Sequence, residues 1–93
     1  METVLRLYVV GGTQLADRAV GALRRLQSEH LGDSAAGEVV DLAERPEVAE
    51  QEGILATPLL VRVAPEPVRR IVGDLSDVER VRWSLGLAGE DGA

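Results

Sequence analysis

The run Val4–Val10 constrains the fold most, because it is apolar everywhere except at Arg6. Successive side chains of a strand point to opposite faces, so a run that is apolar on both faces must be covered on both sides. Such a run is typical of a strand inside a sheet. We therefore expect Val4–Val10 to be a central strand.

A helix is predicted directly after this strand. Gly11 and Gly12 end the apolar run, and Thr13 has a side chain suited to a helix N-cap. Apolar residues then recur at helical spacing, and these residues are Leu15, Ala16, Ala19, Val20, Leu23 and Leu26. Gly32 is the expected end, because glycine commonly closes a helix in the left-handed conformation. Gly21, inside the helix, costs about 1 kcal/mol relative to alanine.

The rest of the chain predicts shorter elements. We expect a loop at 33–37 and a frayed tail at 88–93. The expected elements are a strand at 38–42, a short helix from Pro46 to Gly53, antiparallel strands at 59–63 and 68–72, and a helix at 76–85 that begins with a capping box of Ser76 and Glu79. The order β-α-β-α-β-β-α with a mixed sheet is that of a thioredoxin-like α/β fold. We expect residues 1–87 to form a single domain.

Composition excludes several classes of function. Ten basic against sixteen acidic side chains give a formal charge of -6, which argues against nucleic-acid binding. The chain has no cysteine, so Gly11–Gln14 cannot supply the thiolate that redox proteins of this fold carry at the first helix. His30 is the only histidine, and alone it makes neither a metal site nor a catalytic triad. We expect neither an enzyme nor a cofactor site.

The cytoplasm is the expected location. The first residues, Met1–Arg6, show no secretory pattern. No apolar run approaches the roughly 18 residues that a membrane span requires, so we expect no membrane role.

Three surface features allow either a binding role or a simpler one. Acidic residues gather in and beside the second helix, at Glu44, Glu47, Glu50 and Glu52. Such a cluster can attract a basic partner but is more often a solvated face. Arg69 and Arg70 alternate across their strand and either face a partner or protect a sheet edge. Trp83 is either an interface anchor or partly buried against the sheet.

The segment from Ile54 to Ser76 carries a family resemblance. It reads Ile54-Leu55-Ala56-Thr57-Pro58, a short apolar run, and then Pro65-Glu66-Pro67-Val68-Arg69-Arg70-Ile71-Val72-Gly73-Asp74-Leu75-Ser76. Further matching positions are Leu5–Val9, Arg18-Ala19, Val40-Asp41, Pro46 and Ala49-Glu50. From about Leu5 to Leu87 the chain resembles the KaiB family of circadian clock proteins.

This resemblance implies a non-enzymatic regulator. KaiB proteins bind the ring-shaped ATPase KaiC and, in cyanobacterial clocks, help to sequester KaiA and to displace the output sensor kinase. The family also switches between a KaiC-binding thioredoxin-like monomer and a ground state, tetrameric or dimeric, with the order β-α-β-β-α-α-β. The two folds differ from about Pro46 onward, and such switching requires packings within a few kcal/mol of each other.

The resemblance also assigns roles to residues. The positions expected to bind the partner are Arg18, Glu38, Glu50, Gly53 and Ile54. The positions expected to control the fold state are Pro58, Pro65, Pro67, Ser84 and Gly86, and a cis bond is expected between Thr57 and Pro58.

Some positions depart from the family pattern. Pro65-Glu66-Pro67 replaces three prolines, and Ser84-Leu85-Gly86 replaces Gly-Leu-Asp. Cyanobacterial members present basic residues to KaiC where this chain has Glu38 and Gly53. We therefore expect a divergent KaiC with altered charge as the partner.

Three interpretations stay open. The leading one is a KaiC-binding regulator that rests largely in the thioredoxin-like state, because Ser76–Leu85 is patterned as a capped helix and not as a strand. The second is a KaiB-like adaptor in stress or signalling regulation without an oscillator. The third is a cysteine-free thioredoxin-like protein that binds glutathione or a peptide beside Pro58.

Overall fold

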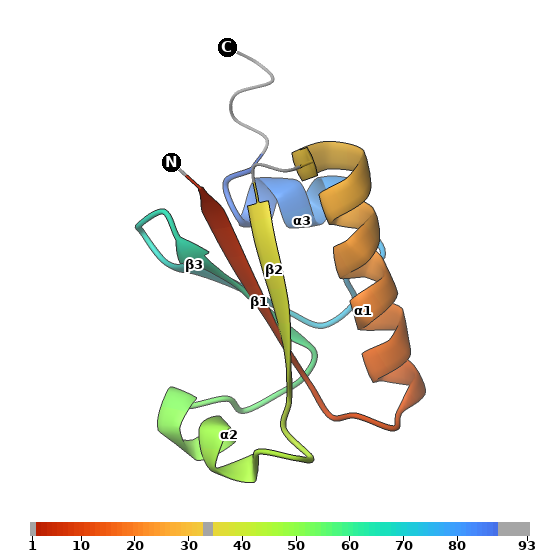
Figure 1. Cartoon of the computed structure of the whole chain (residues 1–93), viewed down its shortest axis with the longest axis vertical. Helices are drawn as coiled ribbons and strands as arrows, with labels where there is room; N and C mark the ends of the chain where they lie inside the picture. Colours follow the sequence, from red (N-terminus) through yellow and green to blue (C-terminus); the bar gives the residue numbers. More distant parts are fainter. Residues whose placement is uncertain (1, 33–34, 88–93) are drawn as a thin grey trace.

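The computed structural model describes residues 2–32 and 35–87 (Figure 1). The elements are β1 (Thr3–Val9), α1 (Gln14–Leu26), the π-helical turn η1 (Gln27–Leu31), β2 (Ala35–Asp41), α2 (Pro46–Glu52), β3 (Leu59–Ala64), β4 (Arg69–Val72) and α3 (Val78–Ser84). This order confirms the prediction of a thioredoxin-like α/β fold. The predicted tail at 88–93 lies outside the described residues.

The strands form one mixed sheet in the order β2-β1-β3-β4. β1 is central as predicted, parallel to β2 and antiparallel to β3, and β3 pairs antiparallel with β4. Arg6 of β1 lies opposite Glu38 of β2 on one side and Val61 of β3 on the other. Because side chains alternate along a strand, Arg6 and Tyr8 share one face of the sheet, and Leu5 and Leu7 share the other.

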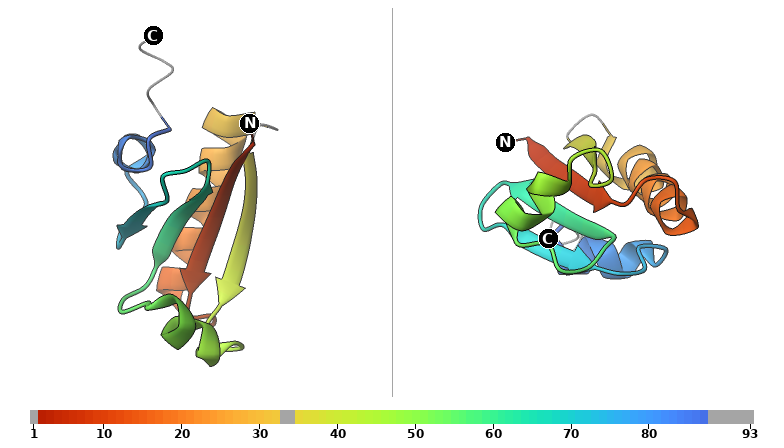
Figure 2. Two further views of the ribbon diagram at one scale, coloured as in Figure 1. Left: turned by 90° about the vertical axis from the view of Figure 1, so that its left-hand side faces the viewer. Right: turned by 90° about the horizontal axis from the view of Figure 1, so that it is seen from below.

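The two faces of the sheet are covered unequally. The larger core lies between the sheet and the helices α1 and α3, and its most deeply buried residues are Leu5, Leu7, Leu26, Leu60 and Leu85. A smaller core on the opposite face comprises Tyr8, Leu42, Val48, Leu59 and Val61. Val48 of α2 is buried in it and Ala49 of α2 packs against it, and α2 crosses only the lower end of this face (Figures 1 and 2).

Side-chain oxygens fix the entry into α1. Thr13 is the N-cap, as predicted, and its Oγ1 accepts from the Ala16 amide at 3.1 Å. Asp41, at the end of β2, accepts from the amides of Gly11 and Ala43 through its Oδ1, each at 2.8 Å. One carboxylate thus ties the loop after β1 to the loop after β2, which satisfies amides that would otherwise lack partners.

The structure corrects two predicted boundaries. Ala35–Gly37 was expected to be loop but belongs to β2, because its register continues parallel to Thr3–Leu5 of β1. The predicted N-cap Ser76 is wrong, since Asp77 holds that position and accepts from the Arg80 amide at 3.1 Å. The amide of Ser76 instead donates to Asp74 Oδ1 at 2.9 Å.

A buried arginine holds the C-terminal end of α3. Arg62 of β3 is 7% exposed, and its guanidinium donates to Leu85 O at 2.8 Å and to Pro67 O at 2.7 Å. Gly86 follows with a φ of +70°, and a Cβ there would lie 2.8 Å from Arg62 Nη1. Because glycine has no side chain, position 86 leaves room for the guanidinium of Arg62.

Candidate partner-binding surface

Four of the five predicted partner-binding residues lie on the α2 side of the sheet. Glu38 lies opposite Arg6, whose face of the sheet also carries Tyr8. Glu50 is exposed on α2, and Ile54 packs against the smaller core that contains Tyr8. Gly53 closes α2 with a φ of +66°, as predicted. We call the exposed part of this side, with these residues, the α2 surface.

The fifth residue is separate. Arg18 is exposed on α1, which covers the opposite face of the sheet. It lines a groove between α1 and the segment that joins β4 to α3. The structure therefore does not bring Arg18 together with Glu38, Glu50, Gly53 and Ile54.

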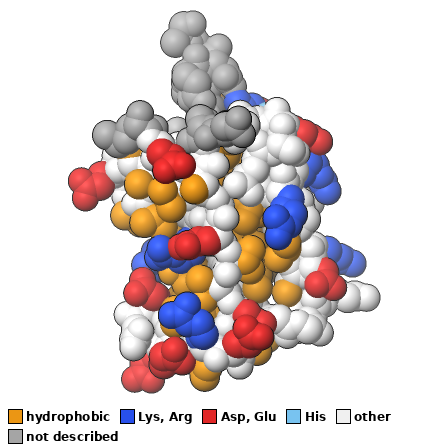
Figure 3. All heavy atoms as spheres, viewed as in Figure 1, with side chains coloured by type: hydrophobic (Ala, Val, Ile, Leu, Met, Phe, Trp, Pro, Cys, Tyr) orange, Lys and Arg blue, Asp and Glu red, His pale blue; other side chains and the backbone are white. Residues whose placement is uncertain are grey.

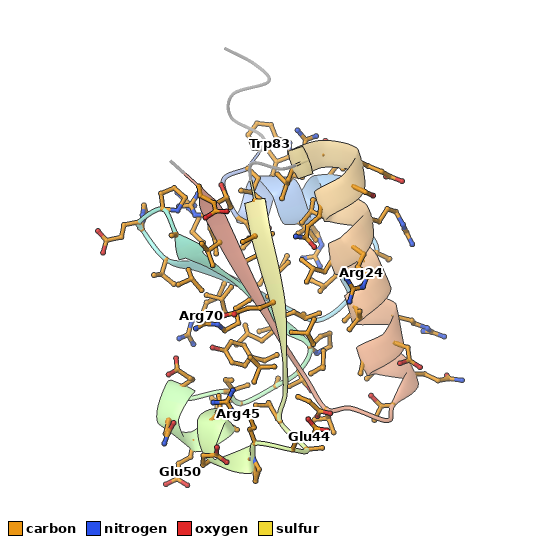
Figure 4. All side chains as sticks on the ribbon, in the orientation of Figure 1. Arg24, Glu44, Arg45, Glu50, Arg70 and Trp83 are labelled. Carbon is orange, nitrogen blue, oxygen red and sulfur yellow. The ribbon has the colours of Figure 1, made fainter. Side chains whose placement is uncertain are left out.

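Charged side chains characterise the α2 surface. Glu38 makes an ion pair with Arg6, and hydrogen bonds to the Tyr8 and Glu38 side chains raise the pKa of Arg6 above its ordinary value. Acidic side chains outnumber basic ones around α2 in Figure 3, and Figure 4 shows Glu44 and Glu50 at this end of the molecule with Arg45 among them. The surface is therefore mainly acidic where it extends over α2.

Leu55 is a residue that the sequence interpretation missed. It follows Ile54 directly, and its side chain is 99% exposed. Because it makes almost no contact within its own chain, nearly all of its apolar surface is accessible to a partner. Arg70 also lies on this face of the sheet, since it pairs with Val61 (Figure 4).

Trp83 does not belong to this surface. It is 68% exposed on α3 at the other end of the molecule from α2 (Figure 4), so most of its surface is open to solvent.

The predicted fold-state residues lie in the C-terminal half. The Thr57–Pro58 bond is cis, as the resemblance implied, and the bonds before Pro65 and Pro67 are cis as well. Pro58 O accepts from the Gly73 amide at 3.0 Å, which joins the start of β3 to the end of β4. Ser84 is the last residue of α3, and Gly86 lies against Arg62.

Within residues 2–32 and 35–87, no helix has the length and apolar character that crossing a membrane requires.

Comparison with known proteins identifies the family. The KaiB domain matches residues 6–87. The circadian clock oscillator protein KaiB of Synechococcus sp. (strain RCC307) is 48% identical over 89 residues, which cover 95% of this chain and 80% of that protein. The protein of the same name from Microcystis aeruginosa is 44% identical over 88 residues, or 95% of this chain and 85% of the relative.

Two solved structures share the fold at low identity. The N-terminal domain of Synechococcus elongatus SasA matches with a TM-score of 0.70 at 21% identity, covering 92% of this chain and 85% of that domain. Chloroplastic thioredoxin z matches with a TM-score of 0.69 at 13% identity, covering 91% of this chain and 79% of that protein. The family assignment depends on the sequence matches, which extend from β1 to the end of α3. On that ground, this chain belongs to the KaiB family.

Proposed function

We propose that this protein is a non-enzymatic regulator that binds a KaiC-type ATPase ring through its α2 surface and takes part in circadian timing. The observation that carries the proposal is the placement of Glu38, Glu50, Gly53 and Ile54 on one side of the sheet. Glu50, Gly53 and Ile54 lie in and directly after α2, whereas Glu38 belongs to β2, so it is the fold that brings Glu38 to the same side as the other three. Leu55 adds an exposed apolar anchor beside them.

Charge directs the choice of partner. Glu38 stands where cyanobacterial relatives present a basic residue, and α2 adds further exposed carboxylates. Complementary potentials determine specificity and association rate more than affinity. The partner is accordingly a KaiC-type ring whose docking site is more basic than that of the cyanobacterial proteins.

Replacing Leu55 tests the α2 surface. Leu55→Asp is expected to weaken binding to the KaiC-type ring by about tenfold or more, because it places a charge in an apolar contact. Leu15→Asp is the matched control, since Leu15 is 59% exposed on α1, which covers the opposite face. Biolayer interferometry with the purified ring measures both variants. Equal weakening by the two variants, or no complex with wild type, contradicts the proposal.

A second pair of variants tests the charge argument. Gly53→Lys supplies the basic side chain that is expected in cyanobacterial relatives. Gly53→Ala is the control, because any side chain strains the backbone at this positive φ and alanine adds that strain without the charge. We expect the lysine variant to bind a cyanobacterial KaiC more tightly than the alanine variant does. Equal affinities would remove the charge argument and leave the α2 surface itself in place.

We also propose that the protein rests mainly as a thioredoxin-like monomer. The Asp77 cap of α3 and the Arg62 contacts with Leu85 and Pro67 support this state. Backbone chemical shifts combined with light scattering test it. A monomer with helical shifts at 78–84 is expected, whereas a tetramer with extended shifts there would refute the proposed resting state.

A sensor kinase that docks through a domain of the same fold would compete for the ring. The SasA N-terminal domain shares the fold of this chain, which supports such competition. A competition assay on the KaiC-type ring, with the sensor domain from the same genome, is expected to show mutual displacement. Simultaneous binding of both proteins at saturation would contradict it.

A further inference from the structure

The outer edge of β4 has no residue among those assigned to the KaiC-type ring. β4 pairs with β3 alone and is the last strand of the sheet on the side away from β2 (Figure 2). An edge strand presents backbone N–H and C=O groups that no neighbouring strand satisfies, so it can accept a strand from another protein. Two consecutive exposed arginines, Arg69 and Arg70, distinguish this edge.

The hydrogen-bond pattern between β3 and β4 shows which backbone groups are free. The Gly73 amide donates to Pro58 O at 3.0 Å, so these two positions form a hydrogen-bonded pair. Hydrogen-bonded and non-hydrogen-bonded pairs alternate along antiparallel strands. In the observed register Ile71 therefore bonds to β3, whereas the amides and carbonyls of Arg70 and Val72 point to the free edge.

The side chains of this edge are cationic and apolar. Arg70 and Val72 lie on the same face of the sheet, because they are two residues apart. Val72 is 50% exposed, and Val68, directly before the strand, is 54% exposed. Arg69 points to the opposite face, toward the end of α3. The edge therefore presents one cation on each face of the sheet, with exposed valines beside them.

Both arginines lack a carboxylate partner in the part of the chain that the structure describes. Neither Arg69 nor Arg70 makes an ion pair there. Arg69 lies directly opposite the buried Arg62, and a Cβ at Gly86 would lie 2.8 Å from Arg62 Nη1 and 3.2 Å from Arg69 Nε. Like charges directly opposite each other on neighbouring strands are destabilising. A carboxylate placed beside Arg69 would offset this repulsion.

We propose that the free edge of β4 binds an extended acidic segment of a partner protein, which adds to the sheet as an antiparallel fifth strand. Its backbone bonds to Arg70 and Val72. Two consecutive acidic residues meet Arg70 on one face of the sheet and Arg69 on the other, and apolar residues on both sides of this acidic pair cover Val68 and Val72. The segment lies along the outer side of β4, one strand away from Pro58 at the start of β3.

Charge selects an acidic partner over a second copy of this chain. Two β4 strands paired with each other would bring four arginines together, which is unfavourable. The formal charge of -6 does not prevent an acidic segment from binding, because exposed charges more than about 8 to 10 Å away are largely screened at physiological ionic strength. The two unpaired arginines therefore dominate the potential at this edge.

The probe is the peptide Thr-Val-Thr-Glu-Asp-Val-Thr, blocked at both ends so that only its two acidic side chains are charged. Added to the full chain, it is expected to cause saturable shifts of the Arg70 and Val72 amide resonances and to slow the exchange of these amide hydrogens. The Ile71 amide, which already bonds to β3, should change less. The same peptide with Gln-Asn in place of Glu-Asp is expected to bind about fivefold more weakly. Absence of saturation, or equal binding of the two peptides, overturns the proposal.

Methyl groups on the peptide backbone separate strand addition from simple charge attraction. In the proposed pairing the amide of the peptide's Glu donates to Arg70 O, whereas the amide of its Asp points away from β4. Methylation of the Glu nitrogen is therefore expected to abolish saturable binding, and methylation of the Asp nitrogen to leave binding unchanged. An equal effect of the two methyl groups would mean that no strand is added, and it overturns the proposal.

Two arginines give a matched pair of variants of the chain. Arg70→Gln removes a charge from the edge and is expected to weaken binding of the acidic peptide about threefold. Arg24→Gln removes the same charge from the exposed side of α1 (Figure 4), and its binding is expected to be unchanged. Unchanged amide shifts in β1 show that both variants are folded. Equal weakening by the two variants would mean a general charge effect and contradicts the proposal.

Discussion

Arg62 offers the sharpest test of how the C-terminal half is held in place. Its guanidinium joins β3 to the loop before β4 and to the end of α3, through Pro67 O at 2.7 Å and Leu85 O at 2.8 Å. Each hydrogen bond of a charged group contributes about 1.5 to 3 kcal/mol. Only 7% of the residue is exposed, so water does not replace these hydrogen bonds when the side chain is removed.

Desolvation reduces this gross contribution. Arg62 has no carboxylate partner among the described residues, and its buried Nε lacks a hydrogen-bond partner. A buried charge of this kind carries a penalty of a few kcal/mol. We therefore expect Arg62→Met, which keeps the apolar stem, to lower the free energy of unfolding by about 2 kcal/mol. That is a substantial part of the roughly 5 to 15 kcal/mol available to a domain.

Urea denaturation followed by circular dichroism measures the effect. Arg70→Met is the matched control, because Arg70 is exposed on the neighbouring strand and should change the stability by less than about 0.5 kcal/mol. Arg62→Met indistinguishable from wild type would refute the argument that this arginine fixes α3. A loss of the same size in Arg70→Met would show a general effect of charge.

Three further predictions concern the loops and α1. Gly21→Ala is expected to raise the free energy of unfolding by about 1 kcal/mol in urea denaturation, since a Cβ there meets nothing. Asp41→Ala should lower it by about 1 to 3 kcal/mol, because the amides of Gly11 and Ala43 lose their acceptor, whereas Asp41→Asn should retain most of it. Hydrogen bonds from Ser76 lower the pKa of Asp74 below its ordinary 3.8, so its stabilising contribution, present above the unfolded pKa, is lost as the pH falls through the lowered folded pKa. Denaturation midpoints of wild type and Asp74→Asn at acid pH measure that loss, and parallel pH profiles would contradict it.

The sequence predicted the elements that local pattern determines. Thr13 as a cap, Gly53 as the end of α2 and the buried run of β1 follow from short-range rules, and the structure confirms them. Ser76 was mistaken for the cap of α3 because Ser76 and Asp77 are both good N-cap residues. In the structure the Ser76 amide donates to the Asp74 carboxylate, and Asp77 caps the helix.

Long-range contacts account for what the sequence did not reveal. Arg62 looked like one polar residue in a buried strand, and nothing nearby indicates that its partners are Pro67 and Leu85. The family resemblance placed Arg18 and Glu38 in one set of binding residues, but they belong to opposite sides of the sheet. The face of the sheet that a residue occupies depends on strand register and packing, and the spacing of charged residues in the sequence predicts neither.

α2 is held to the rest of the molecule by few buried side chains, and this affects the lifetime of any complex that it makes. This helix has seven residues and buries only Val48, and isolated helices of such length do not persist in water. Its amide hydrogens should exchange by local opening while those of β1 remain protected. A partner that holds α2 must suppress this opening, and the lost conformational freedom lowers the affinity that its contacts alone would give. Dissociation can then begin with the fraying of α2, before the partner leaves the sheet.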